Sequence, residues 1–153
     1  MGVTEKLAEF GLTLPPVVPP VASYVPAVRS GDHVFTSGQL PMLDGALTAT
    51  GKVGAEVSAE DATAAARVCA LNALAAIDAL VGIDSVVRIV KVVGFVASAP
   101  GFTGQPGVIN GASNLLGDLF GAAGIHARSA VGVAELPLGA AVEVEMIVEV
   151  APV

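Results

Sequence analysis

The sequence predicts an α+β fold of two layers, in which two helices cover one face of a mixed β-sheet. Segments of alternating polarity occur near both ends of the chain, at 24–37 and 128–150, which is typical of strands with one covered face. A nearly continuous β-branched run at 86–97 is typical of a central strand. Apolar residues at helical spacing separate these segments, so we expect the order β-β-α-β-α-β-β.

The first twenty residues are predicted to form a short helix and an extended arm. Residues 3–10 have a helical pattern that ends at Gly11. The segment LTLPPVVPPVAS that follows contains four prolines, which exclude a helix. We expect this arm either to lie on the body of the domain or to reach a neighbouring subunit. Residues 21–153 are predicted to be a single domain.

The next part of the chain predicts a hairpin, a loop and a helix. The hairpin strands are expected at 24–29 and 33–37, and the glycine-rich stretch 43–57 is expected to be a loop. Ser58, with Asp61 three residues later, predicts the start of the helix, and Gly82 predicts its end. The apolar stripe of this helix consists of Ala66, Cys69, Ala73, Ile77 and Leu80.

The second half of the chain supplies the central strand, a second helix and two final strands. Pro106 is suited to the first turn of that helix, and Gly121 to its end. The segments 128–134 and 142–150 flank a Pro-Gly connection, so we expect them to pair with each other. The even positions of 142–150 are predicted to face the core. The odd positions carry three glutamates, and we expect Arg128 and its small neighbours on that same face.

Composition limits the class of protein. A chain of 153 residues is predicted to be one domain. Charged residues make up 14%, against about 25% in typical soluble chains, so we expect part of the surface to be covered in an oligomer. The net charge of −7 argues against a non-specific nucleic-acid binder.

Localisation is predicted to be cytoplasmic. Cys69 is the single cysteine, which excludes an intramolecular disulfide and fits a reducing compartment. The N-terminus lacks the pattern of a signal peptide. The longest uncharged stretch, 92–117, contains Pro100 and Pro106, so we do not expect it to span a membrane as one helix.

Two motifs resemble those of a known family. The segment SGQLP at 37–41 and the closing pattern HARSAVGVAELPLGAAVEVEMI at 126–147 are similar to the YjgF/RidA family, also called endoribonuclease L-PSP. The resemblance covers about residues 21–150. It implies a chorismate-mutase-like fold and a homotrimer with ligand clefts between subunits. It also implies hydrolysis of reactive enamines and imines of small carboxylates to 2-oxo acids and ammonia, without a metal or organic cofactor.

The same resemblance implies roles for individual residues. Arg128 matches the family arginine that holds the substrate carboxylate, and Ala130 matches a position whose backbone contacts substrate. Glu145 is taken as the glutamate that positions the hydrolytic water. Three further positions match residues of the family's pocket, namely Tyr24, Asn110 and Gly38.

Each of these residues also has a purely structural interpretation. Arg128 could form an ion pair with Glu143 or Glu145, and Glu145 could lie on a solvated strand face, as we expect of Glu143 and Glu149. Tyr24 could be an interface aromatic, and Asn110 could bond to neighbouring backbone. The two histidines lack a second ligand at sensible spacing, so no metal site is expected.

These structural interpretations leave alternative functions open for the whole chain. A trimer that binds a small carboxylate, or another protein, without catalysis would share the cleft and would not need Glu145. An endoribonuclease or translation inhibitor is less compatible with the acidic charge. The longer N-terminal arm and the different 38–58 connection distinguish this chain from the best-studied branch of the family.

Overall fold

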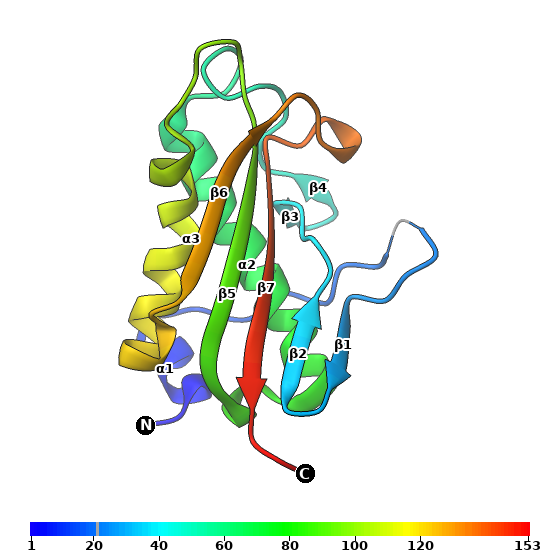
Figure 1. Cartoon of the computed structure of the whole chain (residues 1–153), viewed down its shortest axis with the longest axis vertical. Helices are drawn as coiled ribbons and strands as arrows, with labels where there is room; N and C mark the ends of the chain where they lie inside the picture. The colour runs from blue at the N-terminus through cyan, green and yellow to red at the C-terminus, as the bar shows by residue number, and fades with distance from the viewer. Residues whose placement is uncertain (21) are drawn as a thin grey trace.

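The computed structural model describes residues 1–20 and 22–153 and shows a sheet backed by helices (Figure 1). The helices are α1 (Val3–Glu9), α2 (Ala59–Val81) and α3 (Gln105–Phe120). Short 3₁₀ turns lie at Ile83–Ser85, Gly121–Gly124 and Pro137–Gly139. The strands are β1 (Ala27–Ser30), β2 (His33–Thr36), β3 (Met42–Leu43), β4 (Ala46–Leu47), β5 (Val86–Ala97), β6 (Ala127–Val133) and β7 (Val142–Val150).

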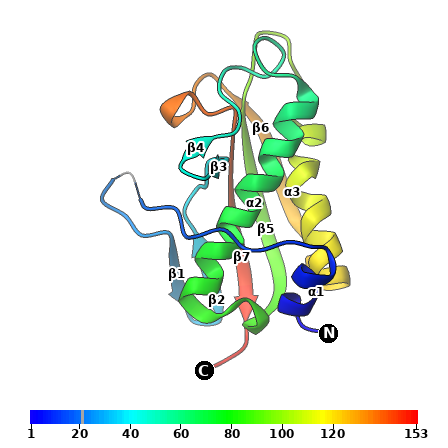
Figure 2. The same cartoon turned by 180° about the vertical axis from the view of Figure 1, so that it is seen from behind.

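The main sheet has five strands in the order β1-β2-β7-β5-β6. β5 and β6 are parallel, and the other neighbours are antiparallel, so the sheet is mixed. α2 and α3 lie against one face, and the other face is open in the single chain (Figures 1 and 2). The predicted α+β class and two-layer arrangement are confirmed.

The expected pairing of the last two strands is wrong. β5 lies between β6 and β7 and is hydrogen-bonded to both. α3 provides the crossover that a parallel β5–β6 pair requires, so β6 runs along β5, and none of the described strands pairs with its far edge. Alternation identified both strands correctly, but it contains no information about which strand pairs with which.

α2 is the central helix of the core. The Ser58 hydroxyl oxygen accepts a hydrogen bond from the Asp61 backbone N–H at 3.0 Å, and Gly82 follows the helix with φ 80°, so both predicted ends are confirmed. Leu80, predicted to be on the buried stripe, is 45% exposed because it lies in the last turn. By length and composition α2 could cross a membrane, yet 56% of its most apolar window is buried inside the chain, as in the core helix of a globular protein.

The stretch expected to be a loop contains a small hairpin of its own. Met42 and Leu43 pair with Leu47 and Ala46, and the two-residue turn between them is Asp44-Gly45. Both turn residues have positive φ, 52° and 81°, which Asp-Gly turns adopt readily. The Asp-Gly pair is a local signal for a hairpin. The glycine-rich composition of the stretch predicted a loop instead.

The N-terminal helix and arm lie on the body of the domain. Val3 and Leu7 of α1 are buried in the core. The Thr4 backbone N–H and hydroxyl donate to the Asp84 carboxylate at 3.0 and 2.7 Å, which fixes α1 beside the start of β5. The arm then crosses the outer side of α2 (Figure 2). The predicted boundary between residues 20 and 21 falls at Val21, which lies outside the described residues.

Candidate functional site

Arg128 is on the helix-covered side of the sheet, contrary to the prediction that it shares a face with the glutamates. It pairs with Val92 of β5, which in turn pairs with Met146 of β7. Residues paired across neighbouring strands point to the same side, and Val92 and Met146 are buried beneath the helices. Arg128 therefore points towards α3 from the outer strand of the sheet.

The small residues of β6 lie on this side because α3 packs closely there. Gly94 of β5 has the Ile109 side chain of α3 directly over it, so even a methyl group would collide. Ala130 pairs with Gly94 and shares its side of the sheet. The larger Val131 points to the open face, where it is 43% exposed. The predicted assignment of the two faces of β6 is therefore wrong. Close packing of α3, rather than hydrophobicity, determines which face of the strand carries the small residues.

The Arg128 guanidinium is held by three neutral groups of α3. Its Nη1 donates to Asn110 Oδ1 at 2.8 Å and to Ser113 Oγ at 3.2 Å, and its Nη2 donates to the Pro106 carbonyl oxygen at 3.3 Å. Among residues 1–20 and 22–153, no carboxylate pairs with it. The structural alternative of an ion pair with Glu143 or Glu145 is therefore not formed within the chain.

His126 extends this arrangement. Its Nδ1 lies 2.6 Å from the Gly124 carbonyl oxygen, which can only accept, so Nδ1 carries the proton. In the neutral ring, Nε2 then accepts the hydrogen bond from the Ser113 hydroxyl at 2.9 Å. The Ser113 oxygen in turn accepts from Arg128. This chain of hydrogen bonds fixes the orientation of the guanidinium.

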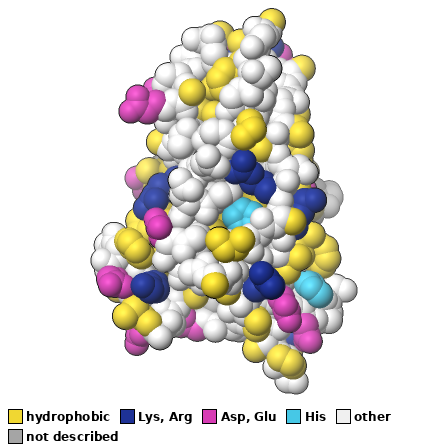
Figure 3. Space-filling view, turned by 60° about the vertical axis from the view of Figure 1, so that its left-hand side comes forward, with side chains coloured by type: hydrophobic (Ala, Val, Ile, Leu, Met, Phe, Trp, Pro, Cys, Tyr) yellow, Lys and Arg dark blue, Asp and Glu magenta, His cyan; other side chains and the backbone are white. Residues whose placement is uncertain are grey.

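A hollow of about 280 Å³ lies beside these groups. Arg128 is its single permanently charged lining residue, so the hollow favours an anion of few atoms. Figure 3 shows the side of the molecule over α3 and β6, where the upper half has few charged side chains and the lower half carries scattered basic and acidic ones. The lining residues are Ser113, Asn114, Gly124, Ile125, His126 and Arg128.

The glutamates of β7 lie on the open face, and Glu143 differs from the solvated residue we expected. It is half-buried, and the pKa of its carboxyl is raised by desolvation and, to a lesser degree, by the nearby charge of Glu145. Gly38 lies against it, and a β-carbon at position 38 would require the Glu143 carboxyl group to move aside. The sequence did not single out Glu143, because its proximity to Gly38 is a contact between segments far apart in the chain.

Glu145 also lies on the open face of β7, and its predicted role in positioning water stays a prediction. It lines a smaller cavity of about 110 Å³ on the open face together with Lys91 and Phe35. Gly38 is next to Gln39, whose backbone is hydrogen-bonded in both directions to Val144. This pairing places Gly38 beside β7, and the glutamate whose carboxyl group lies against Gly38 is Glu143.

Tyr24 lies in the loop before β1 and is 43% exposed. The Ser37 hydroxyl donates to the Val25 carbonyl oxygen at 2.6 Å, which ties this loop to the segment that carries Gly38. The predicted site residues thus fall into two groups. Arg128, Asn110 and Ala130 lie at the β6–α3 edge, whereas the others lie across β5 on the β2–β7 part of the molecule, namely Tyr24, Gly38 and Glu145.

The family model described as Endoribonuclease L-PSP matches residues 16–150. This chain belongs to the endoribonuclease L-PSP family. The resemblance predicted from SGQLP and from the closing pattern is therefore confirmed, and the match begins within the proline-rich arm. Among residues 1–20 and 22–153, no three His, Cys, Asp or Glu side chains are grouped so that they could hold a metal ion.

Three similar proteins are useful for comparison. Protein TCP17 of Trypanosoma cruzi is 46% identical over 149 residues, which are 96% of this chain and 93% of that protein. The crystal structure of Atu1372 from Agrobacterium tumefaciens, of unknown function, is 45% identical with a TM-score of 0.88 and covers 97% of this chain and 91% of its own. Escherichia coli TdcF with bound serine is 26% identical with a TM-score of 0.64, covering 90% and 94%.

Proposed function

We propose that this chain hydrolyses reactive enamines or imines of small carboxylates to 2-oxo acids and ammonia, without a cofactor. The observation that carries the proposal is the state of Arg128. Its guanidinium is positioned by neutral groups at a small hollow and has no carboxylate partner in the described part of the chain. A guanidinium in this state is suited to binding a small carboxylate.

The known ligand of a relative supports the carboxylate class. TdcF was crystallised with serine, a small molecule that bears a carboxylate and an amino group. An imine or enamine derived from such an amino acid would present the same carboxylate to Arg128. The backbone at Ala130, two residues along β6, would lie close to the reacting carbon in this arrangement.

Glu143 is our proposed proton donor and acceptor, in place of Glu145. The reaction adds water to the imine carbon, gives a carbinolamine, and then releases ammonia as the C–N bond breaks. It requires protonation of nitrogen and removal of a proton from the added water. A carboxyl group whose pKa is raised by partial burial is partly protonated nearer neutral pH, which suits it to both transfers.

A second copy of the chain is required to bring the two groups of predicted site residues together. Arg128 and Glu143 belong to different strands and opposite faces of the sheet, so one chain does not bring them together. We propose a homotrimer in which the β6–α3 edge of one copy meets the Gly38–Glu143 region of its neighbour. Tyr24 would then contribute its hydroxyl from the β1 side. We also propose a cytoplasmic location, since the one cysteine is unpaired and buried.

A second candidate is a trimer that binds small carboxylates without turnover. The observation in its favour is that the Arg128 hollow is complete within one chain and has no glutamate in its lining. Binding at Arg128 therefore does not depend on the residues proposed for proton transfer.

The experiment that tests the proposal couples the protein to an enzyme that generates 2-aminoacrylate from serine. We expect faster release of ammonia and pyruvate than in the absence of the protein. In parallel, thermal stability is measured with serine and with pyruvate. Stabilisation by these ligands without faster release would contradict catalysis and support the binding function. RNA cleavage by the same purified preparation, without imine hydrolysis and without stabilisation by serine or pyruvate, would contradict both.

A further inference from the structure

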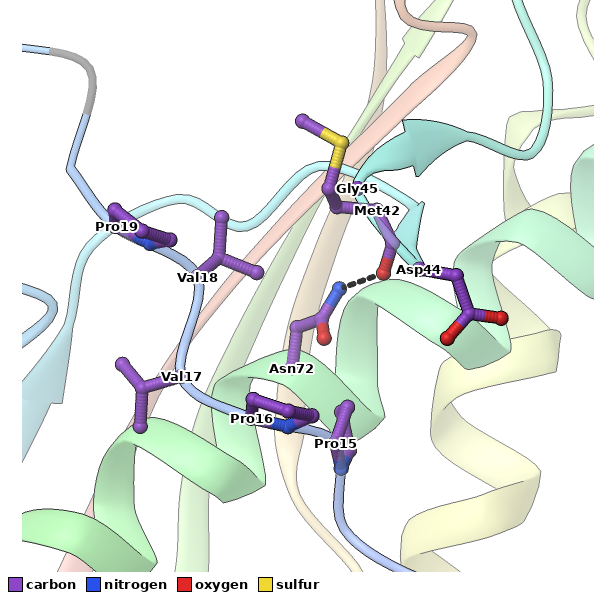
Figure 4. A pocket seen from close by; sticks show the side chains of 9 residues that line it. All are labelled: Pro15, Pro16, Val17, Val18, Pro19, Met42, Asp44, Gly45 and Asn72. Atoms are coloured by element: carbon purple, nitrogen blue, oxygen red, sulfur yellow. Dashed lines mark hydrogen bonds between the residues drawn. The ribbon is translucent and has the colours of Figure 1, made fainter.

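A second cavity, separate from the Arg128 hollow, lies between the proline-rich arm and the β3–β4 hairpin (Figure 4). Its volume is about 170 Å³. Residues 15–19 of the arm form one wall, and Met42, Asp44 and Gly45 of the hairpin form another. Asn72 of α2 lies at the base between them.

Asn72 is the informative residue of this cavity. Asn72 is 1% exposed, although asparagine is a polar residue and the other buried residues of α2 are all apolar. Its Nδ2 donates to the carbonyl oxygens of Leu40 and Met42 at 3.1 and 2.9 Å. Since both partners can only accept, the orientation of the amide group is fixed, with nitrogen towards the hairpin.

The other atom of this amide, Oδ1, is buried and has no hydrogen-bond partner among the residues that the structure describes. The arm that covers it at this point is Pro15-Pro16, and proline nitrogens carry no hydrogen to donate. Figure 4 shows the amide oxygen on the side away from the Met42 hydrogen bond, facing the arm. A buried acceptor without a donor is unfavourable, so a donor from outside the chain would stabilise this cavity.

The remaining lining defines the class of molecule. The walls are proline, valine and methionine side chains, which favour an apolar body. Asp44, exposed at the hairpin turn, is the single charged lining residue and disfavours anions. We propose that this cavity binds a small uncharged molecule with an apolar body and one O–H or N–H group, which donates a hydrogen bond to Asn72 Oδ1. This preference is opposite to that of the Arg128 hollow, which favours a carboxylate.

The test uses phenol and toluene as probes, because they have nearly the same shape and only phenol has a donor. Each is titrated into the full-length protein while the side-chain amide resonances of Asn72 are followed by NMR. We expect phenol to shift these resonances saturably and toluene to bind at least about fivefold more weakly, the effect of one hydrogen bond. Equal affinities, or no shift with phenol up to its solubility limit, would overturn the proposal.

Two variants locate the effect. Val18→Trp fills the cavity from the arm and leaves the Asn72 hydrogen bonds to the hairpin intact, so it should abolish the phenol shift. Val87→Trp adds the same bulk at a 49% exposed position outside the cavity and should not change phenol binding. Arg128→Ala should also leave phenol binding unchanged, which separates this site from the proposed catalytic one. Phenol binding that survives Val18→Trp would place the probe elsewhere and contradict the assignment.

Discussion

The two halves of the proposed site differ in how completely a single chain builds them. At the β6–α3 edge, Arg128 is held by three hydrogen bonds to α3, and Ser113 and His126 fix its orientation. On the open face, Glu143 is half-buried beside Gly38 and next to the like charge of Glu145. The anion-binding half is thus preorganised by the chain itself, whereas the proton-transfer half has an unfavourably placed charge. This difference suggests that ligand binding and turnover can be separated by mutation.

The largest effect is expected at Arg128. Arg128→Ala should weaken binding of serine or pyruvate by about 100-fold or more, because two charge-assisted hydrogen bonds to the carboxylate are lost. Arg128→Lys should restore only part of the affinity, since an ammonium cannot bond bidentately. Isothermal titration calorimetry measures both.

Arg29→Ala is the matched control for this prediction. Arg29 lies on β1, where it bonds to the Gly31 and Ala151 carbonyl oxygens and to Asp32, away from the proposed cleft. Removal of the Arg29 side chain should leave the affinity for serine and pyruvate unchanged. An equal loss in the two alanine variants would mean that general electrostatics, rather than the Arg128 hollow, determines binding.

The second effect distinguishes the two glutamates. Glu143→Gln should lower kcat for imine hydrolysis by about 100-fold, the usual contribution of a general acid or base, and leave the Kd for pyruvate unchanged. Glu145→Gln should lower kcat only a few-fold, through its influence on the Glu143 pKa. Steady-state kinetics with parallel calorimetry tests this pair. A larger loss in Glu145→Gln would restore the role that the sequence suggested for Glu145.

A smaller effect is expected when the support of Arg128 is removed. Ser113→Ala deletes one of the hydrogen bonds that orient the guanidinium, so KM should rise about three- to tenfold with little change in kcat. His126→Ala should have a similar effect, because His126 acts on Arg128 through Ser113. The double variant should be no worse than either single one. Fully additive losses would show that the two residues act independently.

The smallest effect concerns stability and pH. The folded-state pKa of Glu143 is raised above the ordinary value of 4.5, so the unfolded chain releases this proton first as pH rises. The contribution of Glu143 to the free energy of unfolding should therefore fall as pH rises from 4.5 through the raised pKa, whereas the lowered pKa values of Glu56 and Asp84 act with the opposite sign at lower pH. Urea denaturation at several pH values should show a shallower fall for Glu143→Gln. An identical pH dependence would mean that Glu143 is fully solvated.

The sequence by itself determined the class of fold and the family, and it predicted Arg128 as the candidate binding residue. Ser58 and Gly82 mark the ends of α2 through local hydrogen bonding and backbone conformation, which neighbouring residues in the chain suffice to specify. The alternation of β7 likewise identified its buried face, because the period of a strand is a local property.

Only the tertiary structure decided which strands are neighbours and which segments pack against each face of the sheet. β5 separates β6 from β7, and the close approach of α3 at Gly94 places Arg128 on the helix side. The contact between Gly38 and Glu143 joins residues more than a hundred positions apart, so no local pattern could distinguish Glu143 from Glu145. The orphaned Asn72 oxygen similarly arises because an arm of prolines covers a distant helix. Pairing, packing and burial depend on contacts between segments far apart in the chain, and a single sequence does not specify those contacts locally.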